Sequence, residues 1–366
     1  MKILLVAGAR PNFMKIAPLH RAFRQYAQVE TRIIHTGQHY DPLMSDVFFE
    51  QLELPAPDHH LGIHGGSQAQ QVARTMLAFE PVLDAEQPDC VVVVGDVNST
   101  LACALVTSRL GFPLAHVEAG LRSGDRSMPE EINRMLTDAL SDHLFVTESA
   151  GLDNLAREGL LDRNVHLAGN CMIDSLVRFR EKAARTDILA RLGLPSKSYL
   201  LLTMHRPSNV DTLAGLEKLL ALLRGAADRK TLVLPLHPRT RHALEKFGLL
   251  EQLAAIPHLH LLEQQGYLAF IQLLDNAAAV LTDSGGVQEE TTFLQVPCLT
   301  FRRTTERPVT VELGTNILLA DLDPATALQQ LDEVLAGRVK PGTIPPLWDG
   351  HAAERIAAWL VGNTQV

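Results

Sequence analysis

Short apolar runs, many of them rich in β-branched residues, alternate along nearly the whole chain with segments whose apolar positions recur at helical spacing. This alternation is typical of parallel sheets whose strands are joined by crossover helices. The predicted strands are 2–7, 30–36, 90–94, 113–117, 143–147 and 165–168, then 199–203, 231–234, 259–262, 279–282, 298–301 and 316–319. Because open sheets rarely exceed about ten strands, the pattern predicts two sheets of about six strands each.

The fold class that we predict is α/β, with two Rossmann-like doubly wound domains facing each other across a cleft. The first set of strands ends before Gly169-Asn170, which places the first domain at residues 1–169 and the second at 170–351. A breaker cluster at Pro345-Pro346 precedes an apolar helical segment. We expect this C-terminal helix, about 352–366, to pack back on the first domain.

Composition narrows the possible partners. The formal charge of the 366-residue chain is -9, which argues against binding to nucleic acid or to an anionic membrane. No apolar run approaches the roughly 18 residues that a membrane helix requires. The four cysteines stand far apart, as reduced core residues of a cytoplasmic protein do, and no His or Cys spacing indicates a metal site.

Polar residues collect where the predicted strands end. In open parallel sheets ligands bind beyond the carboxyl ends of the strands. In the first half these ends carry 8–15, 95–99 and 118–122, and in the second half 204–206, 237–239 and 283–286. The sequence therefore predicts functional residues at one edge of each sheet.

The segment Thr282–Glu290 indicates an anion site. An apolar strand breaks into Ser284-Gly285-Gly286, and helical spacing then resumes. This arrangement directs backbone N–H groups at the start of a helix towards a ligand, most simply a phosphate. An ordinary glycine-rich connection, with Ser284 as helix cap, is the alternative.

Carboxylates follow two neighbouring strands of the first half. Asp96 and Glu118 should lie close together, and like charges in a partly closed site raise at least one pKa, as acid and base catalysis requires. The alternative for Asp96 is capping of the next helix. Ser127 and Glu130 fit a capping box, which leaves the neighbouring Glu131 as a third candidate.

Several basic residues complete the candidate chemistry. His205 follows a strand of the second half, where a catalytic and a structural role are about equally favoured. Arg10, Lys15 and Arg307 could offset the charge of a diphosphate. Arg134 lies three residues after Glu131, so a solvent-exposed ion pair on the helix is a further possibility.

Taken together, the ordered blocks resemble the non-hydrolysing UDP-N-acetylglucosamine 2-epimerases over about the whole chain. The blocks are 8–11, 35–39, 95–96, 116–122, 129–134, 282–290 and 304–308. The resemblance implies the two-domain glycosyltransferase-B type fold and a homodimer. It also implies interconversion of UDP-N-acetylglucosamine and UDP-N-acetylmannosamine in the cytoplasm, for surface polysaccharides, without a cofactor.

The resemblance also implies residue roles. Asp96, Glu118, Glu131 and His205 would be catalytic, although which carboxylate acts on which face of C2 stays open. The substrate-binding residues would be Arg10 and Lys15 near the diphosphate, Ser284, Gly285 and Gly286 on phosphate, Gln265 and Phe270 at uracil, Glu290 on the ribose, and Arg307 near the nucleotide.

Three departures from the family pattern keep alternatives open. Ser208 replaces a glutamate near His205, and Val97-Asn98-Ser99 replaces a threonine run. The block 38–45 differs from that of enzymes with a regulatory UDP-N-acetylglucosamine site and resembles relatives that act on UDP-2,3-diacetamido-glucuronic acid. A hydrolysing epimerase, a glycosyltransferase of the same fold and a non-catalytic nucleotide-sugar sensor are further alternatives.

Overall fold

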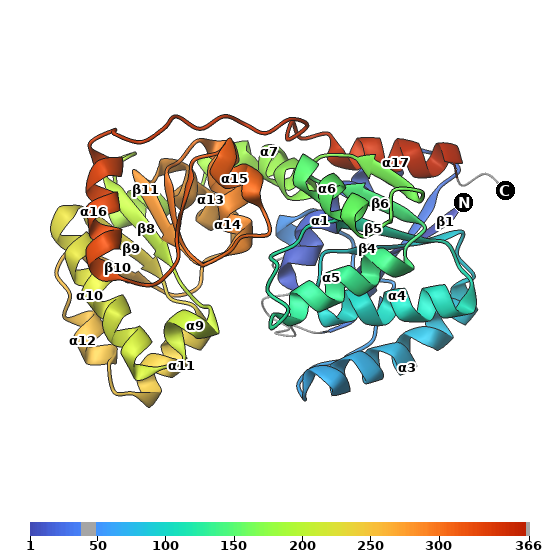
Figure 1. Cartoon of the computed structure of the whole chain (residues 1–366), viewed down its shortest axis with the longest axis horizontal. Coiled ribbons are helices and arrows are strands. Elements are labelled where there is room, and N and C mark those ends of the chain that lie inside the picture. The colour runs from blue at the N-terminus through green and yellow to red at the C-terminus, as the bar shows by residue number, and fades with distance from the viewer. Residues whose placement is uncertain (38–48, 364–366) are drawn as a thin grey trace. The chain divides into compact units, whose positions relative to one another are not determined.

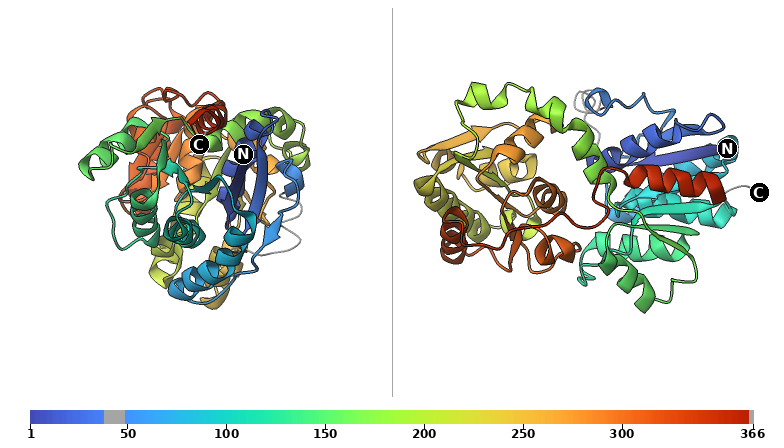
Figure 2. Two further views of the ribbon diagram at one scale, coloured as in Figure 1. Left: turned by 90° about the vertical axis from the view of Figure 1, so that its right-hand side faces the viewer. Right: turned by 90° about the horizontal axis from the view of Figure 1, so that it is seen from above.

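The computed structural model describes residues 1–37 and 49–363, and it divides into two compact units (Figure 1). The first unit contains residues 1–178 and 346–366, and the second contains 179–345. Helix α7 (Cys171–Ala184) begins in the first unit and ends in the second. Both units are parallel sheets with helices packed on their faces (Figure 2). The α/β prediction is therefore confirmed.

The sheet of the first unit has the order β3-β2-β1-β4-β5-β6-β7. Its strands are β1 (Lys2–Ala7), β2 (Glu30–His35), β3 (His59–His60), β4 (Cys90–Val94), β5 (Leu114–Ala119), β6 (His143–Val146) and β7 (Asn164–Leu167). Every residue of β4 is buried, as expected for a strand covered on both faces. The sequence analysis missed β3, whose two residues are too short to give an apolar pattern.

The helices of this unit fill the connections between the strands. They are α1 (Arg10–Phe23), α3 (Gln68–Glu86), α4 (Asn98–Leu110), α5 (Pro129–Leu140), α6 (Ser149–Arg157) and, from the end of the chain, α17 (Ala352–Asn363). Strand order reverses between β1 and β4, so the loops after these two strands meet at the topological switch point. Asn12 joins them, because its side chain accepts from the N–H groups of Gly8 and Ala9 and donates to the carbonyl of Val94.

The second unit repeats this architecture with the order β10-β9-β8-β11-β12-β13. Its strands are β8 (Tyr199–Thr203), β9 (Thr231–Pro235), β10 (Leu259–Leu262), β11 (Ala279–Thr282), β12 (Cys298–Phe301) and β13 (Asn316–Leu319). Its helices are α8 (Ile188–Leu192), α9 (Pro207–Val210), α10 (Leu213–Arg229), α11 (Pro238–Lys246), α12 (Leu250–Ala254), α13 (Tyr267–Asn276), α14 (Gly285–Leu294), α15 (Pro308–Glu312) and α16 (Pro324–Leu335). The switch point lies between β8 and β11.

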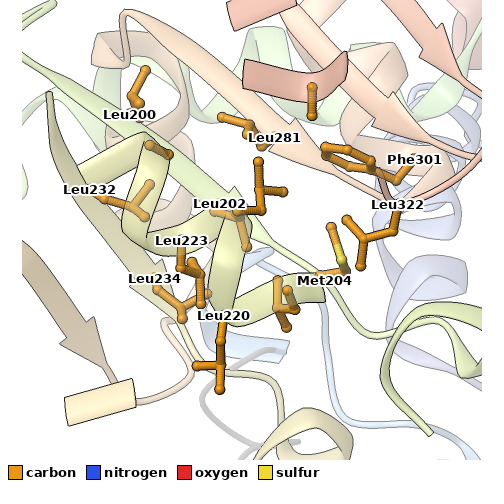
Figure 3. Packing of buried hydrophobic residues seen from close by; sticks show 14 of the residues in the cluster. Leu200, Leu202, Met204, Leu220, Leu223, Leu232, Leu234, Leu281, Phe301 and Leu322 are labelled. Carbon is orange, nitrogen blue, oxygen red and sulfur yellow. The ribbon is translucent and has the colours of Figure 1, made fainter. Parts of the chain in front are cut away.

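Leucine dominates the core of the second unit (Figure 3). Leu200 and Leu202 of β8 lie on the same face because they are two residues apart, and Leu220 and Leu223 of α10 pack in the same cluster. Full burial of each such side chain contributes about 1.5–3 kcal/mol. This packing holds β8 and β11 at fixed positions, and the loops that follow them carry the candidate site residues.

The C-terminal segment packs on the first unit through α17, which lies against α1 (Figure 2). Trp348 is buried, and its indole N–H donates to the carbonyl of Thr147. Asp174 of α7 accepts from the backbone N–H groups of Ala352 and Ala353, which open α17. A carboxylate from another helix therefore caps α17.

Replacing this cap should weaken the docking of α17. We expect Asp174→Ala to lower the free energy of unfolding of the first unit by about 1–2 kcal/mol, since two helix N–H groups lose their acceptor. Both tryptophans of the chain, Trp348 and Trp359, lie in this segment, so urea unfolding followed by tryptophan fluorescence measures the effect. The matched control is Asp153→Ala at an exposed position of α6. Equal stabilities of the two variants would contradict the capping role.

Among the described residues, no helix is both long and apolar enough to cross a membrane. All four cysteines are buried and carry free thiols. Within 1–37 and 49–363, no group of three or more His, Cys, Asp or Glu side chains is arranged to hold a metal ion.

Candidate active site

Two of the predicted carboxylates meet at the switch-point edge of the first unit. Asp96 follows β4, Glu118 lies near the end of β5, and these strands are neighbours in the sheet. Arg134 of α5 joins them: its Nη2 lies 2.7 Å from Oδ2 of Asp96 and 2.9 Å from Oε1 of Glu118. The two carboxylates therefore share one guanidinium.

The backbone of Glu118 has an unusual conformation. Its φ angle is 73°, and the register between β5 and β6 shifts between Val117 and Ala119. A left-handed conformation at a non-glycine residue costs about 1–3 kcal/mol, and the surrounding structure must hold it in place. Bulges of this kind re-aim a side chain, here towards Arg134 and Lys15.

Two cations accompany the two carboxylates. Lys15 of α1 is buried, and its ammonium group forms an ion pair with Oε2 of Glu118. Arg134 is fully buried as well, so the interpretation of its charge as part of a solvent-exposed helix pair is wrong. The sequence could not show this, because the counter-ions of Arg134, which are Asp96 and Glu118, come from the ends of β4 and β5. The two like charges predicted from the sequence are thus each paired with a cation.

Glu131 is buried close to this group but has other partners. Its carboxylate accepts from the N–H and hydroxyl groups of Ser123 and from the N–H of Gly124. The side chain therefore holds the loop that follows β5. The sequence identified Glu131 as a third carboxylate, and the structure gives it this additional contact with the loop.

The predicted capping box at Ser127 is wrong. Helix α5 has Met128 at its N-cap and no side-chain cap, and the hydroxyl of Ser127 instead donates to Asp125. Ser127 forms its bond within the local turn, because the carboxylate of Asp125, two residues earlier, is a nearby acceptor. Capping is also wrong for Asp96, because α4 has Val97 at its N-cap and no side-chain bond there.

The predicted anion segment of the second unit has the expected form. β11 ends at Thr282, Ser284 is the N-cap residue, and α14 begins at Gly285. The side chain of Ser284 makes no capping bond, so the capping alternative does not describe it. A Cβ at Gly285 would lie 2.9 Å from Nη1 of Arg307, so a larger residue there would displace this guanidinium.

Arg307 is held in a buried group of charges. Its Nε lies 2.7 Å from Glu289, and its Nη1 lies 3.4 Å from Glu306. Arg302 also pairs with Glu306 through two bonds of 2.7 and 2.8 Å. Burial alone would raise the pKa of Glu306, but the hydrogen bonds and charges of Arg302 and Arg307 hold it well below its ordinary value. A charged carboxylate thus fixes Arg307 beside the start of α14.

His205 is oriented by Asp283, a residue to which the sequence analysis gave no role. Asp283 is fully buried and accepts from the backbone N–H groups of His205 and Arg206 and from the amide of Asn209. Nδ1 of His205 lies 3.1 Å from Oδ1 of Asp283, and the ring stacks on His237 with centroids 4.8 Å apart. Nε2 is therefore the nitrogen turned away from the carboxylate.

The charge of Asp283 follows from these contacts. Burial by itself would raise its pKa, but the bonds and charge of His205, the amide of Asn209 and the N–H of Arg206 lower the pKa below its ordinary value. A signal for this role exists in the sequence: Asp283 directly follows β11, which pairs with the strand that ends before His205. Ser208, the departure from the family pattern, is exposed on α9.

The other predicted binding residues lie on separate elements. Arg10 is the first residue of α1 and is partly buried. In the second unit, Gln265 precedes α13 and donates to the carbonyl of Glu263, whereas Phe270 lies within α13 and is partly buried. Glu290 is buried on α14. The block 38–45, on which the regulatory-site interpretation rests, lies outside the described residues.

Two doubly wound domains with polar groups at both switch points define a class of fold, the glycosyltransferase-B-like fold. A family model described as UDP-N-acetylglucosamine 2-epimerase matches residues 21–361. The chain is 40% identical over 368 residues to the UDP-N-acetylglucosamine 2-epimerase of Methanocaldococcus jannaschii, covering 98% of this chain and 99% of that protein. The chain belongs to the UDP-N-acetylglucosamine 2-epimerase family, whose members are isomerases.

Two further comparisons bear on the substrate. The chain is also 40% identical over 369 residues to the UDP-2,3-diacetamido-2,3-dideoxy-D-glucuronate 2-epimerase of Pseudomonas aeruginosa, covering 98% of this chain and 99% of that protein. The crystal structure of the Methanocaldococcus jannaschii UDP-GlcNAc 2-epimerase in complex with UDP-GlcNAc and UDP matches with a TM-score of 0.90 and 39% identity. That match covers 99% of this chain and 100% of the other.

Proposed function

We propose that the protein interconverts UDP-N-acetylglucosamine and UDP-N-acetylmannosamine without net hydrolysis. The observation that carries the proposal is the group of Asp96, Glu118, Arg134 and Lys15 at one switch point. Family membership and the relative crystallised with UDP-GlcNAc and UDP support it.

The reaction needs groups that transfer protons. The hydrogen at C2 of the sugar is not next to a carbonyl, so its removal alone would leave an unstabilised carbanion. Loss of that proton together with cleavage of the bond between C1 and the UDP oxygen gives 2-acetamidoglucal and UDP. Return of UDP to C1, with a proton added to the other face of C2, inverts C2. No redox step occurs, so no nicotinamide cofactor is needed.

The proposed roles divide between the two units. In the first unit the C2 proton is exchanged by three carboxylates, those of Asp96, Glu118 and Glu131. The charge of the diphosphate is offset by Arg10 and Lys15. In the second, His205, oriented by Asp283, is the remaining acid or base. A departing diphosphate carries negative charge, which the N–H groups of Ser284, Gly285 and Gly286 and the guanidinium of Arg307 would stabilise. Gln265 and Phe270 would contact uracil, and Glu290 would contact the ribose.

We further propose that the protein is a cytoplasmic homodimer and that its product enters surface polysaccharides.

A modified sugar is the second candidate substrate. The observation that favours it is the equal identity, 40%, to the Pseudomonas aeruginosa enzyme named for UDP-2,3-diacetamido-2,3-dideoxy-D-glucuronate. Both substrates are UDP-sugars with an acetamido group at C2, so the same elimination and re-addition would apply to either.

The deciding experiment incubates the purified protein with each UDP-sugar in D₂O, without added cofactor, and follows the sugar by proton NMR. We expect a manno-configured UDP-sugar with deuterium at C2 to form from UDP-N-acetylglucosamine. Turnover of the diacetamido sugar alone would establish the second candidate. Free N-acetylmannosamine with UDP would indicate the hydrolysing reaction, and binding without exchange would indicate a transferase or a sensor.

A further inference from the structure

A buried histidine–aspartate pair contacts the segments that carry Asp96 and Glu118. His116, in the middle of β5, has a fully buried side chain, and so does Asp138 of α5. Nδ1 of His116 lies 2.6 Å from Oδ1 of Asp138, and Nε2 lies 2.8 Å from the carbonyl oxygen of Gly95. Both ring nitrogens therefore face an oxygen atom.

These contacts place the ring between two acceptors. A carbonyl oxygen only accepts hydrogen bonds, so Nε2 of His116 donates to Gly95. Burial alone would raise the pKa of Asp138, but the charges and hydrogen bonds of His116 and Arg122 lower it below its ordinary value. The ring therefore links the carboxylate of Asp138 to the carbonyl of Gly95.

The second carboxylate oxygen of Asp138 contacts the segment that follows Glu118. Oδ2 accepts from the N–H of Gly120 at 3.0 Å and lies 2.7 Å from Nη2 of Arg122. Arg122 in turn pairs with Glu158 at the end of α6. Gly120 follows the bulge of Glu118 by two residues and has a φ angle of 78°, a conformation that favours glycine.

We propose that His116 and Asp138 are positioning residues that fix Asp96 and Glu118 relative to each other. Through Nε2 the pair holds Gly95, the residue before Asp96, and through Oδ2 it holds Gly120, just after Glu118. Neither side chain has to touch the substrate. The inference rests on the proposed function, because it assigns the pair to the alignment of the two carboxylates for proton transfer at C2.

His116→Gln tests the pair by kinetics. A glutamine amide can donate to the carbonyl of Gly95 but cannot also bridge to Asp138 as the ring does. A displacement of about 1 Å in a catalytic group costs about 10²-fold, so we expect kcat and the rate of deuterium incorporation at C2 to fall together by about 10²-fold. The affinity for UDP alone, measured by calorimetry, should not change. Asp138→Asn should give the same pattern, because its amide offers one acceptor where two are needed.

The matched control is His143→Gln, at a buried histidine of the adjacent strand β6. A core histidine without a positioning role should leave kcat unchanged once thermal unfolding confirms a folded protein. Wild-type kcat in a folded His116→Gln variant, or an equal loss of kcat in His143→Gln, would overturn the inference.

A spectroscopic measurement tests the hydrogen bond to Gly95 independently of catalysis. In wild-type protein labelled with ¹⁵N-histidine, we expect a slowly exchanging N–H signal from Nε2 of His116, absent in His116→Gln. If no such signal is found, the inference fails even if the protein epimerises its substrate. If the wild type turns over neither UDP-sugar in D₂O, the proposed function fails. Persistence of the N–H signal would then support the pair without its catalytic purpose.

Discussion

Glu118→Gln should lower the rate of epimerisation, and of deuterium incorporation at C2, by at least about 10³-fold. Glutamine keeps the shape of the side chain but removes the group that accepts a proton, and general acid and base catalysis contributes about 10²–10⁴-fold. The substitution also leaves Lys15 and Arg134 with one fewer counter-charge, which would shift the position of Asp96.

NMR rate measurement in D₂O, with UDP binding measured by calorimetry, separates these effects from loss of folding. UDP affinity should change much less than the rate, because most groups proposed to hold UDP are in the second unit, although Lys15 of the first unit pairs with Glu118. The control is Glu130→Gln, at an exposed position on the same helix as Glu131, where we expect normal rates. A rate in Glu118→Gln close to that of the control would remove Glu118 from the mechanism.

Ser284→Asp should weaken UDP binding by at least about 10²-fold while the fold is kept. Aspartate is as good an N-cap residue as serine and is favoured at the positive end of a helix, so α14 should remain intact. Its charge would lie where a phosphate is expected. Two like charges about 4 Å apart repel by about 4 kcal/mol at an effective dielectric constant of about 20, and each 1.4 kcal/mol is a factor of ten in affinity.

Calorimetric titration with UDP measures this effect against two controls. Ser284→Ala removes the hydroxyl without adding charge and should cost much less affinity. Thr212→Asp adds the same charge at the N-cap of α10, an exposed position elsewhere in the unit, and should leave binding unchanged. Unchanged affinity in Ser284→Asp would show that phosphate does not bind at the start of α14.

The sequence predicted the elements that define the fold because each buried strand carries its own local signal. The run Cys90–Val94 is apolar throughout, and a strand covered on both faces requires this. Once the strands are located, their ends are known as well. These ends place four candidate residues at the switch-point edges: Asp96, Glu118, His205 and Ser284. The two-residue strand β3 was missed, since it has too few residues for a pattern.

Only the tertiary structure decided which charges meet. Lys15 and Arg134 reach Glu118 from two different helices, α1 and α5. Asp283 accepts from the backbone of His205, and Asp138 accepts from the backbone of Gly120 after β5. Such pairings depend on sheet order and on a bulge at Glu118, neither of which leaves a periodic signal. The sequence by itself therefore determined the fold class and the edge that carries the site. Partners, charge balance and side-chain direction were decided by packing, because they depend on contacts between elements and not on local propensity.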